Sequence, residues 1–447
     1  MGILAFLAES FGSFLTPAFL FAAAVFLFPF IRPARLFHPK SFVHALTDHM
    51  AYSPAYSPAD SKSTPFTALS MALAGTLGVG NITGVASALI SGGAGAVFWM
   101  WAGAVISMVV KYAEVYLAVK FRQRKNGTFC GGAMYYIRDG LTLSGKLPYS
   151  LAAALGGGFA VLCCLNSLIT GNLIQANAAA CVLPGPYRLP CGVILGTLVI
   201  ASILYGSRKI EKITAKLMPP LTAGYMLLAV VILCGNLPLL PEICGDIVRC
   251  AFTPRAAAGG AFGFTVREAL RFGVMRGIFS NEAGCGTSPT AHAAADTKSP
   301  HHQACCGVIE VVFDTLILCS MTAFVLLIAD RKFSVIPWKT DADPSAVTLD
   351  AFHSLTGDAV YVLLILAVML FAYGTIIAQI FYGTSAIRFL TTKKLPLFLY
   401  GCASAGCTVV GAVVSAPVLW TFADILIGGM TVVNCMVLIL LRKSLRD

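Results

Sequence analysis

Two glycine-rich stretches with polar side chains interrupt otherwise apolar parts of the sequence. Residues 75–101 read GTLGVGNITGVASALISGGAGAVFWMW, and no charged residue occurs between Ser63 and Val110. Residues 273–289 read GVMRGIFSNEAGCGTSP, where glycines bracket Ser280, Asn281 and Glu282. Glycine in a helix interior is less favourable than alanine by roughly 1 kcal/mol, so several glycines close together favour a break.

A break in an apolar helix exposes backbone groups that can bind a ligand. In a membrane each unpaired group costs several kcal/mol unless it lines a cavity or meets a ligand. Packing of small residues explains Gly80 and Gly84 well, but it explains less well the polar Thr76 and Asn81 in mid-segment. The N-terminus of a half-helix suits a carboxylate, whereas its C-terminal carbonyls suit an ammonium group or Na⁺. The two stretches therefore predict a site for a zwitterion and a cation.

Composition places these stretches in a membrane protein. The chain has 447 residues, of which 57% are hydrophobic and only 11% charged, and its mean hydropathy is +0.82. Soluble proteins carry about 25% charged residues. The apolar runs have the length of membrane-spanning helices rather than that of the roughly 10-residue strands of a barrel. We therefore expect an all-α membrane protein in a lipid bilayer.

The apolar runs predict eleven transmembrane helices. The first is too long for a signal peptide and is expected to be retained. The two glycine-rich stretches open the second and seventh spans, which predicts two inverted five-helix repeats with broken first helices, plus one extra N-terminal helix. The spans fall near 14–31, 65–90, 95–118, 150–182, 190–206, 214–235, 262–291, 303–329, 357–390, 395–416 and 419–441.

The predicted spans divide the chain into five parts. Residues 1–64 hold the extra helix and a cytoplasmic linker, and 65–235 hold the first repeat. An extracellular connection, 236–261, leads to the second repeat at 262–441, and 442–447 form a cytoplasmic tail.

The placement of basic residues predicts the orientation. One set of alternate loops holds 21 lysines and arginines, and the other set holds 6. Because basic residues concentrate in cytoplasmic loops, we expect the N-terminus outside and the C-terminus inside a plasma membrane, in bacteria the inner membrane. The net charge of +11 thus reflects topology, and no nucleic-acid partner is expected. No obligate protein partner is evident either.

The sequence lacks signs of an enzyme or an organic cofactor. The 15 cysteines scatter through apolar segments without metal-ligand spacing, and most are expected to be small packing residues. Cys181 with Cys191, or Cys244 with Cys250, could form a disulfide. The segment GTLGVGN lacks the third spaced glycine and the preceding strand of a dinucleotide loop. The sequence contains no H-E-x-x-H motif and no plausible Ser/His/Asp arrangement, which argues against an intramembrane protease.

Charged residues inside apolar segments are functional hypotheses by default. Arg276 and Glu282, six residues apart, could pair with each other or gate a passage. Lys111 and Glu114 have the spacing of a local helix pair.

Four further titratable residues favour structural roles. Glu310 and Asp314 share one face of the eighth span, and we expect them to be solvated or paired with a basic loop rather than to relay protons. Asp424 is expected near an interface, and His292 is expected to be packed rather than to carry a proton.

In the two glycine-rich stretches and in several further motifs, the chain resembles the alanine/glycine:cation symporter family, which includes the sodium:alanine symporters. The resemblance implies a leucine-transporter-like fold and sodium-coupled transport of small neutral amino acids such as alanine and glycine, by alternating access. The matching segments are 75–101, KYAEVYLAVKFR (111–122), GGAMYYI (131–137), GNLIQAN (171–177) and RGIFSNEAGCGTSPTAHAAA (276–295), with weaker matches in 205–219, 313–316 and 422–430.

The resemblance also implies roles for individual residues. Twelve positions are expected at the substrate and at the coupling ion, Na⁺. The amino acid would contact Thr76, Gly78, Gly80, Asn81, Gln175, Phe279, Ser280 and Asn281, whereas sodium would bind the carbonyls of Ala74, Leu77 and Phe371 and the Thr375 hydroxyl.

Three positions depart from the family pattern. Gly374 precedes Thr375 where the family usually has a Ser-Thr pair, so one hydroxyl ligand is missing. Gln379 and Thr384 stand where the family tends to have Trp and Glu. These departures leave proton coupling or a different small solute as an alternative. A membrane sensor or a channel is a further alternative, although no ring of polar residues suggests a continuous pore.

Overall fold

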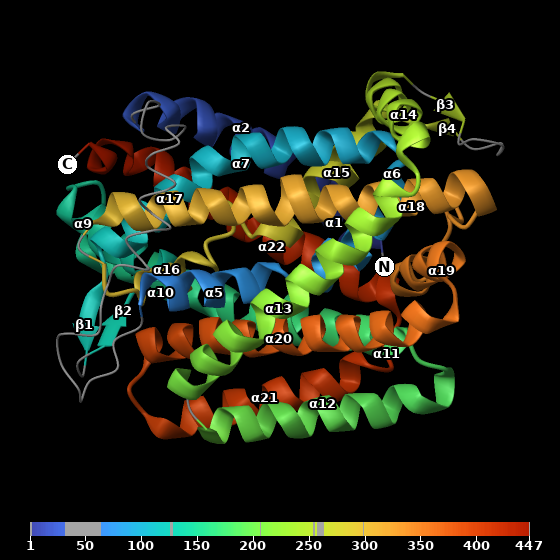
Figure 1. Cartoon of the computed structure of the whole chain (residues 1–447). Coiled ribbons are helices and arrows are strands. Elements are labelled where there is room, and N and C mark those ends of the chain that lie inside the picture. Colours follow the sequence, from blue (N-terminus) through green and yellow to red (C-terminus); the bar gives the residue numbers. More distant parts are fainter. Residues whose placement is uncertain are drawn as a thin grey trace.

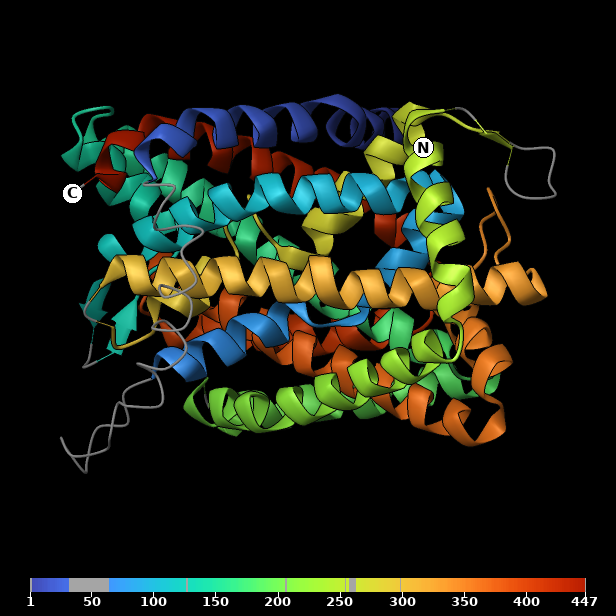
Figure 2. The same ribbon diagram turned by 45° about the horizontal axis from the view of Figure 1, so that its top comes forward.

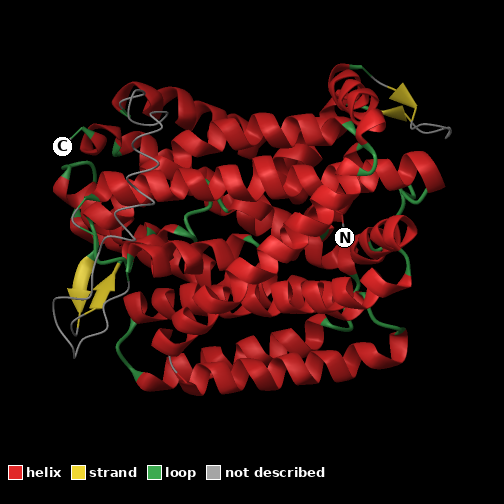
Figure 3. Cartoon of the chain, in the orientation of Figure 1, coloured by secondary structure: helices red, strands yellow, loops and turns green. Residues whose placement is uncertain are grey.

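The computed structural model describes residues 2–31, 64–125, 128–205, 207–253, 255–256, 263–297 and 299–446. The predicted cytoplasmic linker at 32–63, with its basic residues, lies outside the described residues, as does most of 254–262. Nearly everything that is described is helical (Figure 3). Two short antiparallel hairpins, β1–β2 (Gln123–Lys125, Thr128–Cys130) and β3–β4 (Arg255–Ala256, Gly263–Phe264), lie at opposite ends of the bundle.

The helices of the first half include most of the predicted spans and several short additions. They are α1 (Gly2–Ser10), α2 (Thr16–Leu27), α5 (Pro65–Thr76), α6 (Thr83–Gly92), α7 (Gly95–Lys120), α8 (Ala133–Tyr135), α9 (Leu141–Leu143), α10 (Tyr149–Asn166), α11 (Ile174–Cys181), α12 (Gly185–Tyr205) and α13 (Ser207–Cys234).

The second half continues in the same way. Its helices are α14 (Leu240–Phe252), α15 (Val266–Asn281), α16 (Pro289–Ala293), α17 (Pro300–Val311), α18 (Ser320–Phe333), α19 (Pro344–Thr356), α20 (Asp358–Leu390), α21 (Lys394–Gly411) and α22 (Ala416–Leu440).

Short π- and 3₁₀-helical segments connect or extend these helices. The π-helical segments join helices without ending the rod, as in α10 to α11 and α17 to α18, where the paired helices act as one span. The π segments are Phe11–Leu15, Tyr136–Gly140, Ser167–Leu173 and Val312–Cys319, and the 3₁₀ segments are Phe28–Phe30, Val79–Asn81, Leu237–Leu239 and Arg442–Leu445.

The described residues contain nine helices that are long and apolar enough to cross a membrane, or ten if α5 and α6 form one bent span. The sequence predicted eleven. The missing one is the predicted span 262–291, where α15 has only 16 residues and includes Arg267, Glu268, Arg271 and Arg276. The protein is therefore an all-helical, multi-pass membrane protein, but this segment alone does not meet the length and polarity of a simple span.

Among the helices outside the predicted spans, α14 and α19 are the longest, with 13 residues each, and were not expected. Helix α14 lies in the predicted extracellular connection and buries Ile243, Ile247 and Ala251 along one face, while Glu242 and Arg249 are exposed. Helix α19 starts after Asp343, whose carboxylate accepts hydrogen bonds from the backbone of the first turn. Both are too short to span a bilayer, so a search for long apolar runs does not find them.

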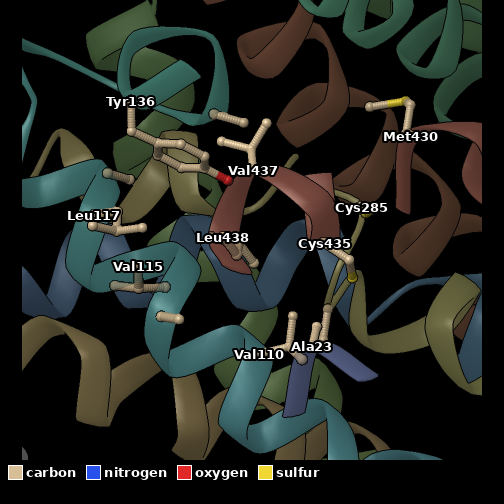
Figure 4. Packing of buried hydrophobic residues seen from close by; sticks show 14 of the residues in the cluster. Ala23, Val110, Val115, Leu117, Tyr136, Cys285, Met430, Cys435, Val437 and Leu438 are labelled. Carbon is tan, nitrogen blue, oxygen red and sulfur yellow. The ribbon is translucent and has the colours of Figure 1, made fainter. Parts of the chain in front are cut away.

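The long helices run side by side along one direction (Figures 1 and 2). Helix α7 contributes Val110, Val115 and Leu117 to a cluster of buried hydrophobic residues that also includes Val437 and Leu438 of α22 (Figure 4). At the bottom of Figure 1, α12 and α21 lie side by side. The C-terminus lies at the end with the β1–β2 hairpin, and the N-terminus lies toward the end with α14 and α19 (Figures 1 and 2).

Candidate functional site

The first glycine-rich stretch is a broken helix, as its sequence predicts. Helix α5 begins with Pro65 after Thr64, whose hydroxyl accepts a hydrogen bond from Thr67 N, and ends at Thr76. Leu77 and Gly78 leave the helical conformation, and the axis turns by 53° before α6 continues. A 3₁₀ turn at Val79–Asn81 separates the two halves.

Side chains from distant helices hold the backbone of this break. The amide oxygen of Gln175, on α11, accepts a hydrogen bond from Val79 N at 3.2 Å. The hydroxyl of Thr375, on α20, donates to the carbonyl of Ala74 at 2.9 Å. A Cβ on Gly78 would lie 3.0 Å from both Gln175 Oε1 and Thr375 Cβ, so this position requires glycine for the close approach.

The second glycine-rich stretch is also broken. Helix α15 ends at Asn281, and the chain then passes through Glu282 at φ 52°, Gly284 at φ 89° and Gly286 at φ 77° before α16 begins. Positive φ is uncommon for a non-glycine residue, so Glu282 is held in a specific backbone conformation by its surroundings.

Three polar residues of α7 and α22 satisfy the backbone of the second break. The Glu114 carboxylate accepts hydrogen bonds from Gly284 N at 3.0 Å and Gly286 N at 2.9 Å. Asn434 donates to the Gly284 carbonyl at 2.9 Å, and the Lys111 ammonium donates to the Asn281 carbonyl at 2.8 Å. Because water is absent from the interior of a bilayer, such side chains are what makes a break tolerable there.

The carboxylate of Asp314 links the two breaks. It accepts hydrogen bonds from Asn81 Nδ2 at 2.6 Å, in the first break, and from Ser280 Oγ at 2.8 Å, at the end of α15. Thr315 Oγ1 also donates to it, and Asn281 Nδ2 donates to Thr315. The polar side chains of both sequence stretches therefore meet on the π-helical segment Val312–Cys319.

A small cavity lies where the two breaks approach each other. Its volume is about 10 Å³, which is room for roughly one water molecule. This volume is much smaller than that of a free amino acid. The cavity is lined by Gly75, Thr76, Gly78, Gly80, Asn166, Thr170, Gln175, Ile278, Phe279, Glu282, Cys285, Thr375, Gln379 and Ile427.

Six of the twelve predicted site residues line this cavity. They are Thr76, Gly78, Gly80, Gln175, Phe279 and Thr375. The remaining six are buried beside it but do not line it. Of these, Asn81, Ser280 and Asn281 bond to the Asp314–Thr315 pair, Ala74 accepts from Thr375, and Leu77 and Phe371 are buried hydrophobic residues.

Several lining residues were not predicted as site residues. Asn166 and Thr170 come from the end of α10 and the π-helical segment after it, and Gln379 comes from α20. Glu282 was singled out only as a charge within an apolar stretch. A side-chain amide within an otherwise apolar segment is the signal by which Asn166 and Gln379 could have been selected from the sequence.

The missing hydroxyl at Gly374 has a structural counterpart. A Cβ at this position would lie 2.5 Å from Met218 Sδ of α13. A methionine thioether therefore fills the space beside Gly374, and a serine at 374 would require Met218 to move.

The structure corrects the predicted pairings of charged residues. Arg276 does not pair with Glu282, because its guanidinium binds Asp424 at 2.9 Å and lies 4.2 Å over the Trp420 ring. Lys111 forms its ion pair with Glu310 at 3.2 Å, and Glu114 binds backbone instead of Lys111. Sequence spacing along one helix misled here, since the true partners come from other helices.

Glu310 and Asp314 are not solvated, contrary to expectation. Both side chains are 0% exposed. Glu310 binds Lys111 and also His292 Nε2 at 2.9 Å, while Gln303 donates to His292 Nδ1. His292 is packed and hydrogen-bonded, as expected, and Asp424 is buried. The structure contains neither of the two disulfides considered, Cys181 with Cys191 or Cys244 with Cys250.

Comparison with known proteins decides the family. The profile of the sodium:alanine symporter family matches residues 4–447. The chain belongs to this family. The sodium/alanine symporter AgcS of Methanococcus maripaludis is 36% identical over 381 residues, which are 84% of this chain and 81% of that protein. An uncharacterized transporter of Haemophilus influenzae is 36% identical over 383 residues, which are 85% of this chain and 77% of that protein.

A solved structure supports the fold. It is that of Mhp1, a nucleobase-cation-symport-1 family transporter in a closed conformation with bromovinylhydantoin bound. The two structures align with a TM-score of 0.51 and 14% identity over 85% of this chain and 77% of Mhp1. The family resemblance seen in the sequence motifs is thus confirmed, and the family is one of transporters in which sodium is the implied coupling ion.

Proposed function

We propose that this protein imports small neutral amino acids, alanine and glycine, together with sodium by alternating access. The observation that carries the proposal is the meeting of two broken helices at one buried cavity, with polar side chains of four other elements on its wall. A broken helix presents a partial positive charge at the N-terminus of one half and a partial negative charge at the C-terminus of the other, without a charged side chain. These ends suit the two charges of a zwitterion and an alkali cation.

The substrate is proposed to lie along the first break. Thr76, Gly78 and Gly80 offer backbone close to the cavity, and Gln175 offers its amide to the carboxylate. The ring of Phe279 contacts that of Trp420 in a tilted arrangement, with centroids 4.6 Å apart, and a Cβ on Gly80 would lie 3.2 Å from the Phe279 ring. This ring leaves little room for a side chain, which favours alanine and glycine. Asn81, Ser280 and Asn281 are proposed to hold the two breaks together through Asp314 and Thr315.

Sodium is proposed to bind beside the end of α5. The carbonyls of Ala74, Leu77 and Phe371 and the hydroxyl of Thr375 are the proposed ligands. The 2.9 Å bond between Thr375 and the Ala74 carbonyl supports this, because it shows that two of the four oxygens already lie together. An ion here would tie α5 to α20 and so order the first break for substrate.

We also propose the arrangement of the chain in the membrane. Eleven spans, with α15 and α16 as the two halves of the seventh, would give two inverted five-helix repeats after the helix at 14–31. An odd number of spans places the termini on opposite sides, in keeping with their positions at opposite ends of the bundle (Figure 2). The loop charges place the N-terminus outside and the C-terminus in the cytoplasm.

Transport by the reconstituted protein tests the proposal. Proteoliposomes containing the full chain are expected to accumulate radioactive alanine when sodium is higher outside, and unlabelled glycine is expected to compete. Potassium in place of sodium is expected to abolish accumulation. Uptake that is equal in sodium and potassium would reject sodium coupling.

One observation favours a second candidate. The Met218 thioether fills the space beside Gly374, so the proposed sodium site has one hydroxyl fewer than the family pattern. If a proton gradient drives alanine accumulation in sodium-free buffer, the coupling ion is the proton and the rest of the proposal stands.

Gln175→Ala is expected to weaken alanine binding by about 10- to 100-fold, the range for a hydrogen bond to a charged group. The variant also removes the acceptor for Val79 N. Equilibrium binding of tritiated alanine to the purified protein measures the effect. The matched control is Asn177→Ala on the same helix, whose amide donates to the Gly411 and Val414 carbonyls away from the cavity. Equal affinity in the Gln175 variant and in the control would remove Gln175 from the site.

Thr375→Ala is expected to raise the sodium concentration needed for half-maximal alanine uptake by about tenfold, as expected for the loss of one polar ligand. The control is Thr408→Ala, which removes a buried hydroxyl that donates to the Ser404 carbonyl of its own helix. Uptake by the two variants is measured over a range of sodium concentrations. An unchanged sodium requirement in the Thr375 variant would place the ion elsewhere.

A further inference from the structure

Three oxygen-bearing side chains on the cavity wall have no role in the proposed sodium site. Glu282 follows α15, Asn166 ends α10, and Gln379 lies in α20. All three line the cavity, and they are 6%, 3% and 2% exposed, respectively. Three separate elements thus bring carboxylate and amide oxygens to one buried place.

Two of these oxygens have no hydrogen-bond donor. Gln379 Oε1 and Asn166 Oδ1 are buried and lack a partner among the described residues. An unsatisfied buried acceptor costs about 1–3 kcal/mol. The Gln379 amide nitrogen donates to the Glu282 carboxylate, which places the amide of Gln379 directly beside the charge. Two unpaired acceptors on a wall with a carboxylate indicate a ligand that is a cation.

The carboxylates around the cavity also favour a cation. Glu114, Glu282, Glu310 and Asp314 are buried carboxylates, whereas Lys111 is the ammonium group bound among them. Unpaired charges in a membrane interior are strongly unfavourable. His292 Nε2 lies within hydrogen-bond distance of the Glu310 carboxylate oxygen that does not bind Lys111, and Arg276 forms an ion pair with Asp424.

Of these four carboxylates, Glu282 is the one that lines the cavity. Glu310 is paired with Lys111, Glu114 accepts from two backbone N–H groups and Asn434, and Asp314 accepts from Asn81, Ser280 and Thr315. Among the described residues, the Glu282 carboxylate accepts side-chain hydrogen bonds only from the Thr287 hydroxyl and the Gln379 amide. It also caps the C-terminus of α15, where the helix dipole disfavours an anion and favours a cation.

We propose that Glu282, Gln379 and Asn166 form a second sodium site, separate from the one at Thr375. The site supplies a carboxylate and two amide oxygens, the hard donors that an alkali cation prefers. This inference rests on the proposed function and extends it, because it implies that two sodium ions accompany each amino acid. It also gives Gln379, a departure from the family pattern, a specific task.

Equilibrium binding of radioactive sodium to the purified full chain, without any amino acid, tests the second site. The unaltered protein is expected to bind two ions per molecule. Glu282→Gln keeps the size and the polar contacts of the side chain but removes its charge, and it is expected to bind one. Asn166→Ala and Gln379→Ala are each expected to weaken one of the two binding phases by about tenfold. These neutral variants keep the test decisive if Glu282→Gln does not fold.

The controls separate this inference from the proposed function. Glu9→Gln alters an exposed carboxylate that binds Arg267 and is expected to leave both ions bound. Thr375→Ala is expected to weaken binding of the other ion by about tenfold and to leave the one at Glu282 unchanged. If the unaltered protein binds one ion, whose binding Thr375→Ala weakens and Glu282→Gln does not affect, the second site is rejected while sodium symport stands. Binding of protons but no sodium at Glu282 would also reject it. If the unaltered protein binds no sodium, the proposed function itself fails.

Discussion

Replacing the buried lysine of α7, Lys111→Met, is expected to destabilise the protein by about 3–5 kcal/mol, the range for breaking a buried ion pair from one side. The Lys111 side chain is 0% exposed and binds the Glu310 carboxylate at 3.2 Å. It also donates to the Asn281 carbonyl and to Ser288 Oγ, on the two sides of the second break. Its loss leaves Glu310 without its ammonium partner and leaves the break without a donor. Thermal unfolding in detergent measures the change.

A double variant distinguishes this from a simple packing defect. Lys111→Met/Glu310→Gln removes both charges and is expected to recover a large part of the lost stability, because no unpaired charge remains buried. Lys394→Met, at an exposed position, is the control for loss of a positive charge and is expected to unfold like the unaltered protein. A double variant that is no more stable than the single one would contradict the assigned pair.

Adding one methyl group to the first break, Gly78→Ala, is expected to reduce alanine uptake by at least about 100-fold, a loss of roughly 3 kcal/mol that overpacking can produce. The added Cβ would collide with the Thr375 hydroxyl and lie 3.0 Å from Gln175 Oε1. Both proposed sites would be displaced together, since Thr375 belongs to the sodium site and Gln175 to the substrate site. Initial rates of uptake into proteoliposomes give the measurement.

The matched control is Gly84→Ala, six residues along in α6. A Cβ at Gly84 would meet only Phe279 at 3.9 Å and Trp420 at 4.0 Å, which are ordinary contacts. Alanine also favours a helix more than glycine does. This variant is expected to transport at near-normal rates, and similar losses in both variants would show that the effect at Gly78 is not specific to the site.

The length and apolarity of the segments predicted most of the spans. Long runs such as the one at α20 need no tertiary information, because a bilayer demands a minimum apolar length. Helices α14 and α19 escaped prediction because they are short. The predicted span 262–291 differs most from its expectation, since α15 contains four charged residues, three of which form ion pairs with other segments of the fold. Arg276, for example, is neutralised by Asp424, 148 positions away.

The two helix breaks could be predicted from the sequence, but the side chains that hydrogen-bond to their backbone could not. Clustered glycines with Thr76, Asn81 and Ser280 marked both breaks from the sequence alone. Which side chain satisfies each exposed backbone group depends on how helices pack. Glu114 of α7 accepts hydrogen bonds from Gly284 N and Gly286 N, which lie far away along the chain. The spacing within α7 suggested an ion pair with Lys111 instead. Asn166 entered the site in the same unforeseen way, through the packing of α10 against α20.

The central claim is that sodium prepares the paired breaks for the amino acid, and linkage between the two ligands tests it most directly. The measurement is equilibrium binding of tritiated alanine to the purified full chain, with sodium varied against potassium at constant ionic strength. Alanine affinity is expected to rise with sodium by about 5- to 150-fold, the usual range of coupling between two sites. By the same linkage, alanine is expected to raise the affinity for sodium by an equal factor. Alanine that binds equally well in sodium and in potassium would contradict the account.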